Sequence, residues 1–304
     1  MRRATFSLSI LSLLLAAGIS SVAPAEPYRL DKRQAQLADA LARQADPDSL
    51  AAAGLLSAAD PEKESQLLRR ATAAAPERAD LVWLQIQACH KRTACDSESL
   101  ERRLRTLDPE NGAASLGALA RADALRDEPA KDAALAALSH STRVDIYWTT
   151  LIARLSRAAA RTGKMSLPDT EVLIIGLLAA QAVPALQIVS TSCKGERLER
   201  AEVVTACRGI ARAFEGGDTY LMEMFGTAIA KRVWPEQSPQ WAAATDARRS
   251  YEYRSALQQK IDRRPWDEKG AASYLALCEQ NRREQDVYRA RLLAAGENPD
   301  PPRN

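Results

Sequence analysis

The chain of 304 residues carries 42 lysines and arginines against 39 aspartates and glutamates, which gives a formal net charge of +3. So small an excess of positive charge argues against a broad surface for nucleic acid or another polyanion. The composition is rich in Ala, Leu, Arg and Glu and holds only 13 glycines, so it predicts a mainly helical protein of one large or two modest domains.

The N-terminal segment has the pattern of a secretory signal peptide. Two arginines follow Met1, residues 6–19 are uncharged and largely apolar, and residues 23–25 form the small-x-small motif Ala-Pro-Ala. The apolar stretch is too short to span a bilayer stably, which disfavours the alternative of an uncleaved anchor. We therefore expect cleavage after Ala25 and export to the periplasm. The removed segment carries two arginines and no acid, so the net charge of the mature chain falls to +1.

The segments between chain breakers have the spacing of amphipathic helices. Leu37 and Leu41 lie one helical turn apart, and Pro47 and Pro61 each follow an aspartate at a place where a helix can begin. No stretch alternates apolar and polar residues as a half-buried strand would. The sequence predicts an all-α fold, built as a stack or bundle of antiparallel helical hairpins.

The mature chain divides into three parts by composition. We expect a region of helical repeats over residues 26–165, a helical bundle over 166–297 and a disordered, proline-rich tail over 298–304. The second part begins with residues 166–169, Ser-Leu-Pro-Asp, which have the pattern of a capping box at the start of a helix.

Residues 76–122 show a repeat of about the length of one helical hairpin. The dipeptide Pro-Glu occurs at 76–77 and again at 109–110, 33 residues later. The three helices expected in this region are 81–91, 97–107 and 113–122. A helix–turn–helix unit of this period resembles the tetratricopeptide repeat family, which implies helix pairs that stack on one another.

The residues inside this unit match the family's pattern in part. Leu81 and Leu84 fall on its early apolar positions, Leu104 falls on a later small position, and residues 108–114 look like the junction between two repeats. Three positions depart from the pattern: Gln85, Ala88 and Ser97. The alternative is a generic antiparallel helix pair.

The segment 172–193 has no charged residue and is long enough to cross a membrane. Its glutamines and serines, and a proline at position 184 that would kink a helix, favour instead a buried helix at the centre of a large helical domain. We therefore expect no stable membrane span.

The first two cysteines are candidates for a disulfide. Cys89 is expected at the end of one helix and Cys95 just before the next, so the two face each other across a hairpin turn at a distance that a disulfide can bridge. The oxidising compartment implied by export favours this bond. A metal site with His90 would lack further ligands, and two unpaired thiols are the remaining alternative.

The other three cysteines are less constrained. Cys193 and Cys207 can pair only if residues 194–200 fold back, since a helix beginning near Glu196 would place Cys207 about 16 Å along its axis. Cys278 is left over. We expect it to be a buried thiol on an apolar helix face, with intermolecular pairing as the alternative.

The chain lacks the motifs of common catalytic sites, including the zinc-protease, nucleophile-elbow and dinucleotide-loop patterns. Three neighbouring carboxylates, Glu196, Glu199 and Glu202, alternate with Arg197 and Arg200, which is typical of a solvated, ion-paired helix face. We therefore expect no catalytic residues, no metal ligands and no cofactor.

Residues 231–291 hold half of the mature chain's aromatic side chains together with an excess of basic residues. The aromatic residues in this window are Trp234, Trp241, Tyr251, Tyr253, Trp266, Tyr274 and Tyr288. Trp, Tyr and Arg dominate binding hot spots, so we interpret Trp234, Trp241 and Trp266, each near a proline, as candidate anchors of a binding surface. The alternative is that these aromatics fill the core of a helical bundle.

These patterns favour a non-enzymatic role. The sequence predicts an exported helical protein, a scaffold or adaptor that binds a protein or peptide partner through a helical surface and does not bind nucleic acid. Two alternatives stay open: an immunity-type inhibitor of an exported toxin, and an envelope enzyme that uses carboxylates. A cavity where Glu and Arg side chains converge would favour the enzyme, and a shallow apolar groove would favour binding.

Overall fold

A computed structural model describes residues 31–302, except 93–94, 182, 184 and 263–265. Within these residues the chain forms fifteen α-helices and one short 3-10 helix, and the only β-type pairing is an isolated bridge between Asn111 and Arg143. The predicted all-α fold is confirmed. The proposed signal peptide lies outside the described residues.

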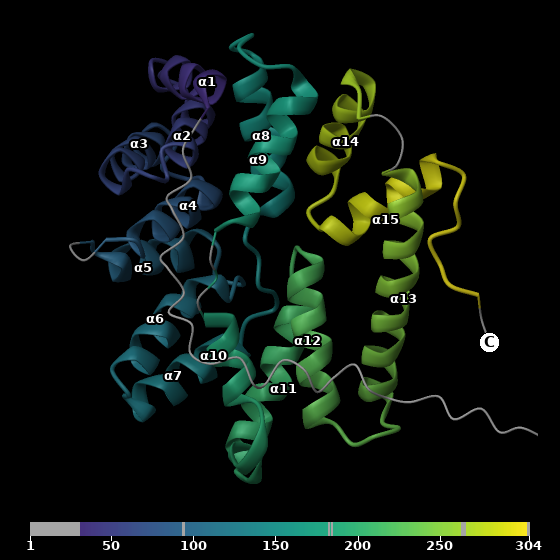
Figure 1. The fold of residues 1–304 in the computed structure, drawn as a ribbon. Helices are drawn as coiled ribbons and strands as arrows, with labels where there is room; N and C mark the ends of the chain where they lie inside the picture. Colours follow the sequence, from purple (N-terminus) through teal and green to yellow (C-terminus); the bar gives the residue numbers. More distant parts are fainter. Residues whose placement is uncertain (1–30, 93–94, 182, 184, 263–265, 303–304) are drawn as a thin grey trace, which may run out of the picture.

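The first seven helices pack in chain order and form the left side of the molecule in Figure 1. They are α1 (Lys32–Ala42), α2 (Pro47–Leu56), α3 (Pro61–Ala74), α4 (Ala79–Cys89), α5 (Ser97–Leu107), α6 (Ala113–Ala124) and α7 (Glu128–Ser139). Each packs against the next, so this half is a stack of helical hairpins. The expected helix at 97–107 matches α5, whereas α4 begins and ends two residues earlier than the expected 81–91.

Aspartate side chains begin most of these helices. Asp46 and Asp60 precede the prolines that open α2 and α3, and each accepts a hydrogen bond from the backbone N–H three residues on, at 3.0 and 3.1 Å. Such a cap satisfies one of the donors that a helix N-terminus leaves unpaired. The same aspartate cap recurs at Asp31, Asp96 and Asp127.

The second half surrounds a central helical pair. The helices are α8 (Trp148–Ala160), α9 (Leu167–Ala179), α10 (Ala185–Ser192), η1 (Gly195–Glu199), α11 (Ala201–Glu215), α12 (Tyr220–Val233), α13 (Pro239–Ile261), α14 (Glu268–Gln280) and α15 (Glu284–Ala294). The pair α8–α9 lies between the N-terminal stack and α14 (Figure 1). The two halves meet here and also where α10 and α11 pack against α6 and α7.

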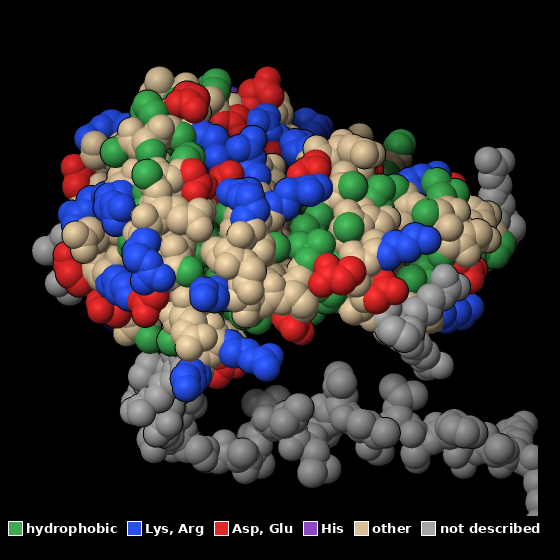
Figure 2. Space-filling model, turned by 90° about the horizontal axis from the view of Figure 1, so that it is seen from above, with side chains coloured by type: hydrophobic (Ala, Val, Ile, Leu, Met, Phe, Trp, Pro, Cys, Tyr) green, Lys and Arg blue, Asp and Glu red, His purple; other side chains and the backbone are tan. Residues whose placement is uncertain are grey.

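A continuous cluster of buried apolar side chains extends from Leu37 in α1 to Val287 in α15, across the expected boundary at residue 165. A small second cluster of Leu257, Ile261 and Leu292 lies between α13 and α15. Over the top face of the molecule, basic and acidic side chains are interspersed, in keeping with the small net charge (Figure 2).

The charge-free segment 172–193 does not form the single buried helix expected from its composition. It is divided between α9, which ends at Ala179, and α10, which begins at Ala185. At the break, the Gln181 side chain donates to the backbone oxygen of Leu177 at 3.3 Å, so a polar residue within the apolar segment helps to end α9. No helix in the described part of the chain is long and apolar enough to cross a membrane.

Both candidate cysteine pairs are disulfides in the structure. The Cα atoms are 5.5 Å apart in Cys89–Cys95, which closes the turn between α4 and α5. They are 5.7 Å apart in Cys193–Cys207, where η1 folds the chain back after α10 and Cys207 of α11 reaches the residue that follows α10. Cys278 is a free, buried thiol in α14, as its apolar surroundings predict.

A buried aspartate joins three loops at the centre of the molecule. Asp218 accepts hydrogen bonds from the backbone N–H groups of Ile146 at 3.0 Å and Trp148 at 2.8 Å, where the chain enters α8. Between these two residues, Tyr147 has a φ of 59°, a left-handed conformation that a bulky side chain adopts only under constraint. The backbone oxygen of Asp218 also accepts from the N–H of Glu284 at the start of α15.

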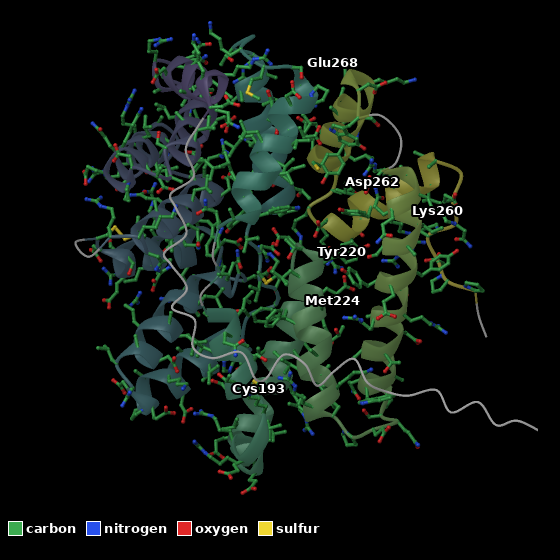
Figure 3. The ribbon with its side chains drawn as sticks, in the orientation of Figure 1. Cys193, Tyr220, Met224, Lys260, Asp262 and Glu268 are labelled. Atoms are coloured by element: carbon green, nitrogen blue, oxygen red, sulfur yellow. A yellow bond between two sulfur atoms is a disulfide. The ribbon has the colours of Figure 1, made fainter. Side chains whose placement is uncertain are left out.

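The C-terminal lobe is held by aromatic and polar contacts. The rings of Tyr220 in α12 and Tyr251 in α13 are 5.0 Å apart, and Figure 3 places Tyr220 and Met224 along α12. The proline-rich tail, expected to lack order, contacts this lobe: Arg289 forms a bidentate ion pair with Asp300 at 2.6 and 2.8 Å.

Candidate binding groove

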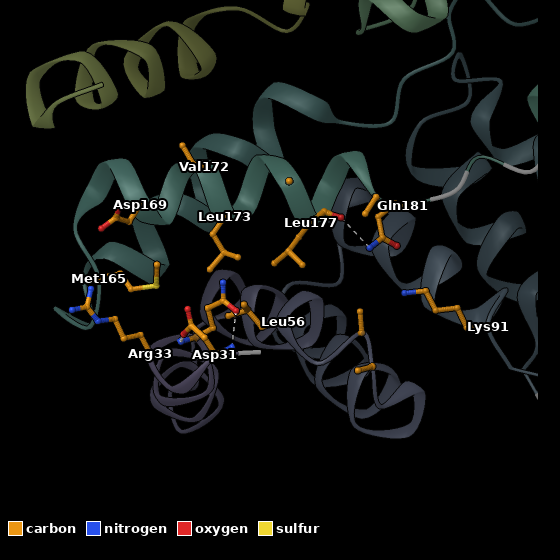
Figure 4. Close-up of a pocket in the computed structure, with 15 residues that line it drawn as sticks. Asp31, Arg33, Leu56, Lys91, Met165, Asp169, Val172, Leu173, Leu177 and Gln181 are labelled. Carbon is orange, nitrogen blue, oxygen red and sulfur yellow. Dashed lines mark hydrogen bonds between the residues drawn. The ribbon is translucent and has the colours of Figure 1, made fainter. Parts of the chain in front are cut away.

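An open groove of about 820 Å³ lies between α9 and the helices α1 and α2. Its length follows the exposed face of α9 from Asp169 to Ala180, about 16 Å of helix. The close-up in Figure 4 shows Leu173 and Leu177 pointing from α9 toward α1 and α2, with Leu56 on the opposite wall. We call this feature the α9 groove.

The lining of the α9 groove is mainly apolar and contains several small residues. From α9 come Val172, Leu173, Gly176, Leu177 and Ala180, and Leu56, Ala58, Ala59 and Met165 complete the apolar lining. The α9 positions are spaced three and four residues apart, so they share one face of the helix. A Cβ atom added at Gly176 would meet no heavy atom within 4 Å, which shows that the middle of this face is open.

The groove exists because α9 is apolar on more than one face. Its buried residues are Thr170, Glu171, Ile174 and Leu178, which leaves the other apolar side chains without a covering helix. Val172 is 61 % exposed, the second highest value among the large exposed hydrophobic side chains of the described residues. A contiguous exposed apolar surface of this kind is typical of an interaction site.

Charged residues line the ends of the groove in a balanced set of two acids and two bases. Asp31 caps α1 by accepting from the N–H of Gln34 at 2.8 Å, and Asp169 accepts from the hydroxyl of Ser166 at 2.7 Å. Lys91 donates to both carboxylate oxygens of Glu64, at 2.9 and 3.1 Å. Three of the four charges are therefore already engaged in the fold, and the groove presents little net charge to a ligand.

The acid with the strongest perturbation on α9 lies outside the groove. Glu171 is fully buried, and neither of its carboxylate oxygens completes a hydrogen bond with the described residues. Burial raises the pKa of Glu171 to about 8, although the Arg291 guanidinium and the Trp266 indole N–H both act to lower it. At neutral pH this carboxyl group is mostly protonated, which suits its apolar position.

The predicted anchor residues lie in the C-terminal half, and none of them lines the α9 groove. Trp234 packs partly against the core beneath Arg212, whose guanidinium carbon is 5.6 Å from the ring centroid. Trp241 lies beneath Lys231 at 4.9 Å. Each of the two indole rings is half-buried.

The third anchor candidate, Trp266, is more enclosed. Arg291 stacks on its ring at 4.7 Å, Tyr274 meets it edge-on at 5.8 Å, and its indole nitrogen is buried. Trp266 therefore lies against α14 and α15. Its ring does not contact the ring of Trp234 or Trp241, so the three tryptophans do not form one patch by ring contacts. Whether these residues bind a partner stays a prediction.

The sequence contains a signal for the groove, although its composition predicts a buried helix there. The charge-free run from Val172 onward supplies most of the groove's apolar wall. Whether this apolar wall is exposed depends on where α1 and α2 pack in the tertiary structure, which the sequence pattern of α9 does not specify.

Comparisons with known proteins give no family assignment: no family model, no curated protein and no solved structure matches the chain. Among the described residues no group of three or more His, Cys, Asp or Glu side chains has the arrangement of a metal site. The chemistry of the groove is therefore the evidence on function.

Proposed function

We propose that the protein binds a protein or peptide partner, without catalysing a reaction, by accepting an apolar α-helical segment of that partner in the α9 groove. The observation that carries this proposal is the open apolar face of α9, from Val172 to Ala180. Helix-in-groove recognition places aliphatic side chains at three- and four-residue spacing into such a surface.

The shape of the groove favours a helix as the occupant. Small residues at Ala58, Ala59, Gly176 and Ala180 leave room for a backbone to approach closely, and packed helices lie about 8–10 Å apart. The charges at the ends of the groove balance one another, and most of them are already paired within the protein. They therefore favour a partner that contributes an apolar face rather than a highly charged one. An extended acidic or basic peptide is a poorer match.

The groove also supports binding over carboxylate catalysis. The two acids whose pKa values are raised most by burial, Glu171 and Asp218, do not line the groove. An inhibitor of an exported toxin would be one special case of the same binding role. Both disulfides are in keeping with the export that the N-terminal sequence predicts, because disulfides persist in oxidising compartments.

Filling the groove tests this proposal. In the Gly176→Trp variant the new side chain would start from open space, because a Cβ atom at this position meets no heavy atom within 4 Å, and its indole would occupy the middle of the groove. Leu125→Trp is the matched control, because Leu125 is 78 % exposed on α6 and remote from the groove lining. Tagged mature proteins would be used to capture partners from the native envelope, and the captured proteins identified by mass spectrometry.

We expect a partner that is captured by the wild-type protein and by Leu125→Trp and is lost with Gly176→Trp. Circular dichroism and the melting temperature of the three proteins should agree, so that loss of the partner is not loss of the fold. A partner that binds Gly176→Trp as well as the wild-type protein would contradict the proposal.

A further inference from the structure

A second cavity, a cleft of about 450 Å³, shares no lining residue with the α9 groove. It is lined by Asp48 of α2, by Thr150, Ala153, Arg154, Arg157 and Arg161 at the face and end of α8, and by Cys278 and Glu279 of α14. We call it the α8 cleft. Its volume lies in the range of pockets that hold small molecules, about 300–1,000 Å³.

Three guanidinium groups line the α8 cleft along one helical face. Arg154, Arg157 and Arg161 are three and four residues apart, so they span about 10 Å of α8. Arg157 is paired with Glu279 in a bidentate contact at 2.5 and 2.8 Å. Arg161 has a longer contact of 3.5 Å with Asp46.

Arg154 differs from its two neighbours. It is exposed, and no acidic side chain among the described residues pairs with it. One turn earlier, the hydroxyl of Thr150 lies on the same face and makes no hydrogen bond to any described residue, whereas that of its neighbour Thr149 donates to Arg282. The cleft therefore presents two adjacent sets of unused donors, a forked guanidinium and a hydroxyl.

The acids in the lining do not neutralise Arg154. Asp48 accepts from Arg78 at 2.7 Å, and Glu279 is held by Arg157. The lining as a whole carries three arginines and two acids, a formal charge of +1. This balance suits a ligand with one negative charge better than a multiply charged anion.

We infer that the α8 cleft binds a small organic monocarboxylate. The planar guanidinium of Arg154 would take the carboxylate in a bidentate contact, the geometry in which arginine binds such groups most strongly. The Thr150 hydroxyl donates a further hydrogen bond to the same carboxylate. The small, buried Ala153 and the buried Cys278 also line the cleft, and they would contact the ligand's uncharged end.

The inference is tested with a pair of ligands that differ only in charge. N-acetylglycine carries one carboxylate, and N-acetylglycinamide has nearly the same shape but no charge. Binding of each to the mature protein would be followed by NMR chemical-shift titration, with methyl phosphate as a third ligand. Because hydrogen bonds to charged groups contribute about 1.5–3 kcal/mol, we expect the carboxylate to bind roughly ten- to a hundredfold more tightly than the amide.

Variants locate the binding to the cleft. Arg154→Gln removes the charge but keeps a long polar side chain, and it should weaken carboxylate binding at least about tenfold. Thr150→Val should weaken it by a smaller factor. Arg70→Gln is the matched control, since Arg70 is an exposed arginine of α3 outside the cleft, and it should bind as the wild type does.

Three outcomes would overturn the inference: no saturable binding of N-acetylglycine, equal binding of the amide, or binding that Arg154→Gln leaves unchanged. Tighter binding of methyl phosphate than of N-acetylglycine would overturn the assignment of ligand class. None of these results depends on the α9 groove, so this inference and the proposed function can fail separately.

Discussion

Glu171 and Val172 are neighbours in the sequence but face different sides of α9: the first is fully buried, and the second is 61 % exposed in the α9 groove. An acid therefore occupies the core side of the helix and an aliphatic residue the open side. For this pair of residues the usual arrangement of an amphipathic helix is reversed, although Ile174 and Leu178 on the core side are apolar.

The buried acid should make the stability of the protein depend on pH. The pKa of Glu171 is raised from an ordinary value of 4.5 to about 8. The contribution of its protonated carboxyl group to the free energy of unfolding is therefore fully present below pH 4.5 and is lost as the pH rises through 8. Glu171→Gln mimics the protonated acid. It should change the free energy of unfolding little at pH 5 and stabilise the protein at pH 9, by on the order of 4 kcal/mol.

Urea denaturation at pH 5, 7 and 9 measures this effect. Glu196→Gln serves as the control, because Glu196 is exposed and its replacement should leave the pH profile unchanged. If Glu171→Gln and the wild-type protein keep parallel profiles up to pH 9, Glu171 is not the titrating group.

The two disulfides should differ in their contribution to stability. A disulfide stabilises more when it closes a longer loop of the unfolded chain. The Cys193–Cys207 bond, with a sequence separation of 14, should contribute about 3 kcal/mol, and the Cys89–Cys95 bond, with a separation of 6, about 2.4 kcal/mol. Cys193 and Cys207 are also buried in the main core, so replacing them with alanine leaves a cavity. Peptide mapping should show both bonds in the exported protein, and the Cys193→Ala/Cys207→Ala variant should have the lower urea midpoint.

Zinc provides an independent check on the first pair. Because Cys89 is bonded to Cys95, neither sulfur is available as a thiolate ligand. Added zinc should leave the melting temperature unchanged. Stoichiometric zinc in the purified protein would contradict the disulfide.

The three candidate anchor tryptophans should separate by the stability of their alanine variants. Trp234 and Trp266 pack against the main core, so each replacement should lower the free energy of unfolding by on the order of 2 kcal/mol. Trp241 contacts Lys231 outside that core, so Trp241→Ala should change stability by less than about 1 kcal/mol. Thermal and urea denaturation measure the difference. Equal losses for all three would refute this division.

The buried Asp218 should be among the most sensitive polar positions. Asp218→Ala leaves the backbone N–H groups of Ile146 and Trp148 without an acceptor, which should destabilise the protein by on the order of 3 kcal/mol. Asp218→Asn keeps one acceptor oxygen and should lose about half as much. Asp286→Ala, at an exposed position, is the control in urea denaturation. An Asp218→Ala loss no greater than that of the control would show that these hydrogen bonds contribute little.

Local features of the fold could be predicted from the sequence, because they depend on nearby residues. The aspartates before Pro47 and Pro61 and the bounds of α5 follow from capping and proline geometry. The bond between Cys89 and Cys95 follows from one short turn. The bond between Cys193 and Cys207 does not follow from the sequence alone, since it depends on whether residues 194–200 fold back.

The candidate site could not be predicted in the same way. Whether Val172 is covered or open depends on the position of α1, more than a hundred residues away in the sequence. Likewise, Glu171 looks from its sequence like an ordinary acid near a helix start, and its burial depends on the helices that pack against α9, among them α8 and α14. The free donors of Arg154 and Thr150 also depend on which acids of other helices reach α8.

The positions of the five cysteines bear on how the chain acquires its bonds. Each disulfide joins near neighbours, six and 14 residues apart, and both lie upstream of Cys278. In a chain that crosses a membrane N-terminus first, both partners of each bond emerge together, and the fifth thiol follows only after four sulfurs have been able to pair. Burial then raises the pKa of Cys278 to about 12, which suppresses the thiolate needed for exchange. Correct oxidation would therefore follow from the order of emergence, with little need for an isomerase to reshuffle wrong pairs.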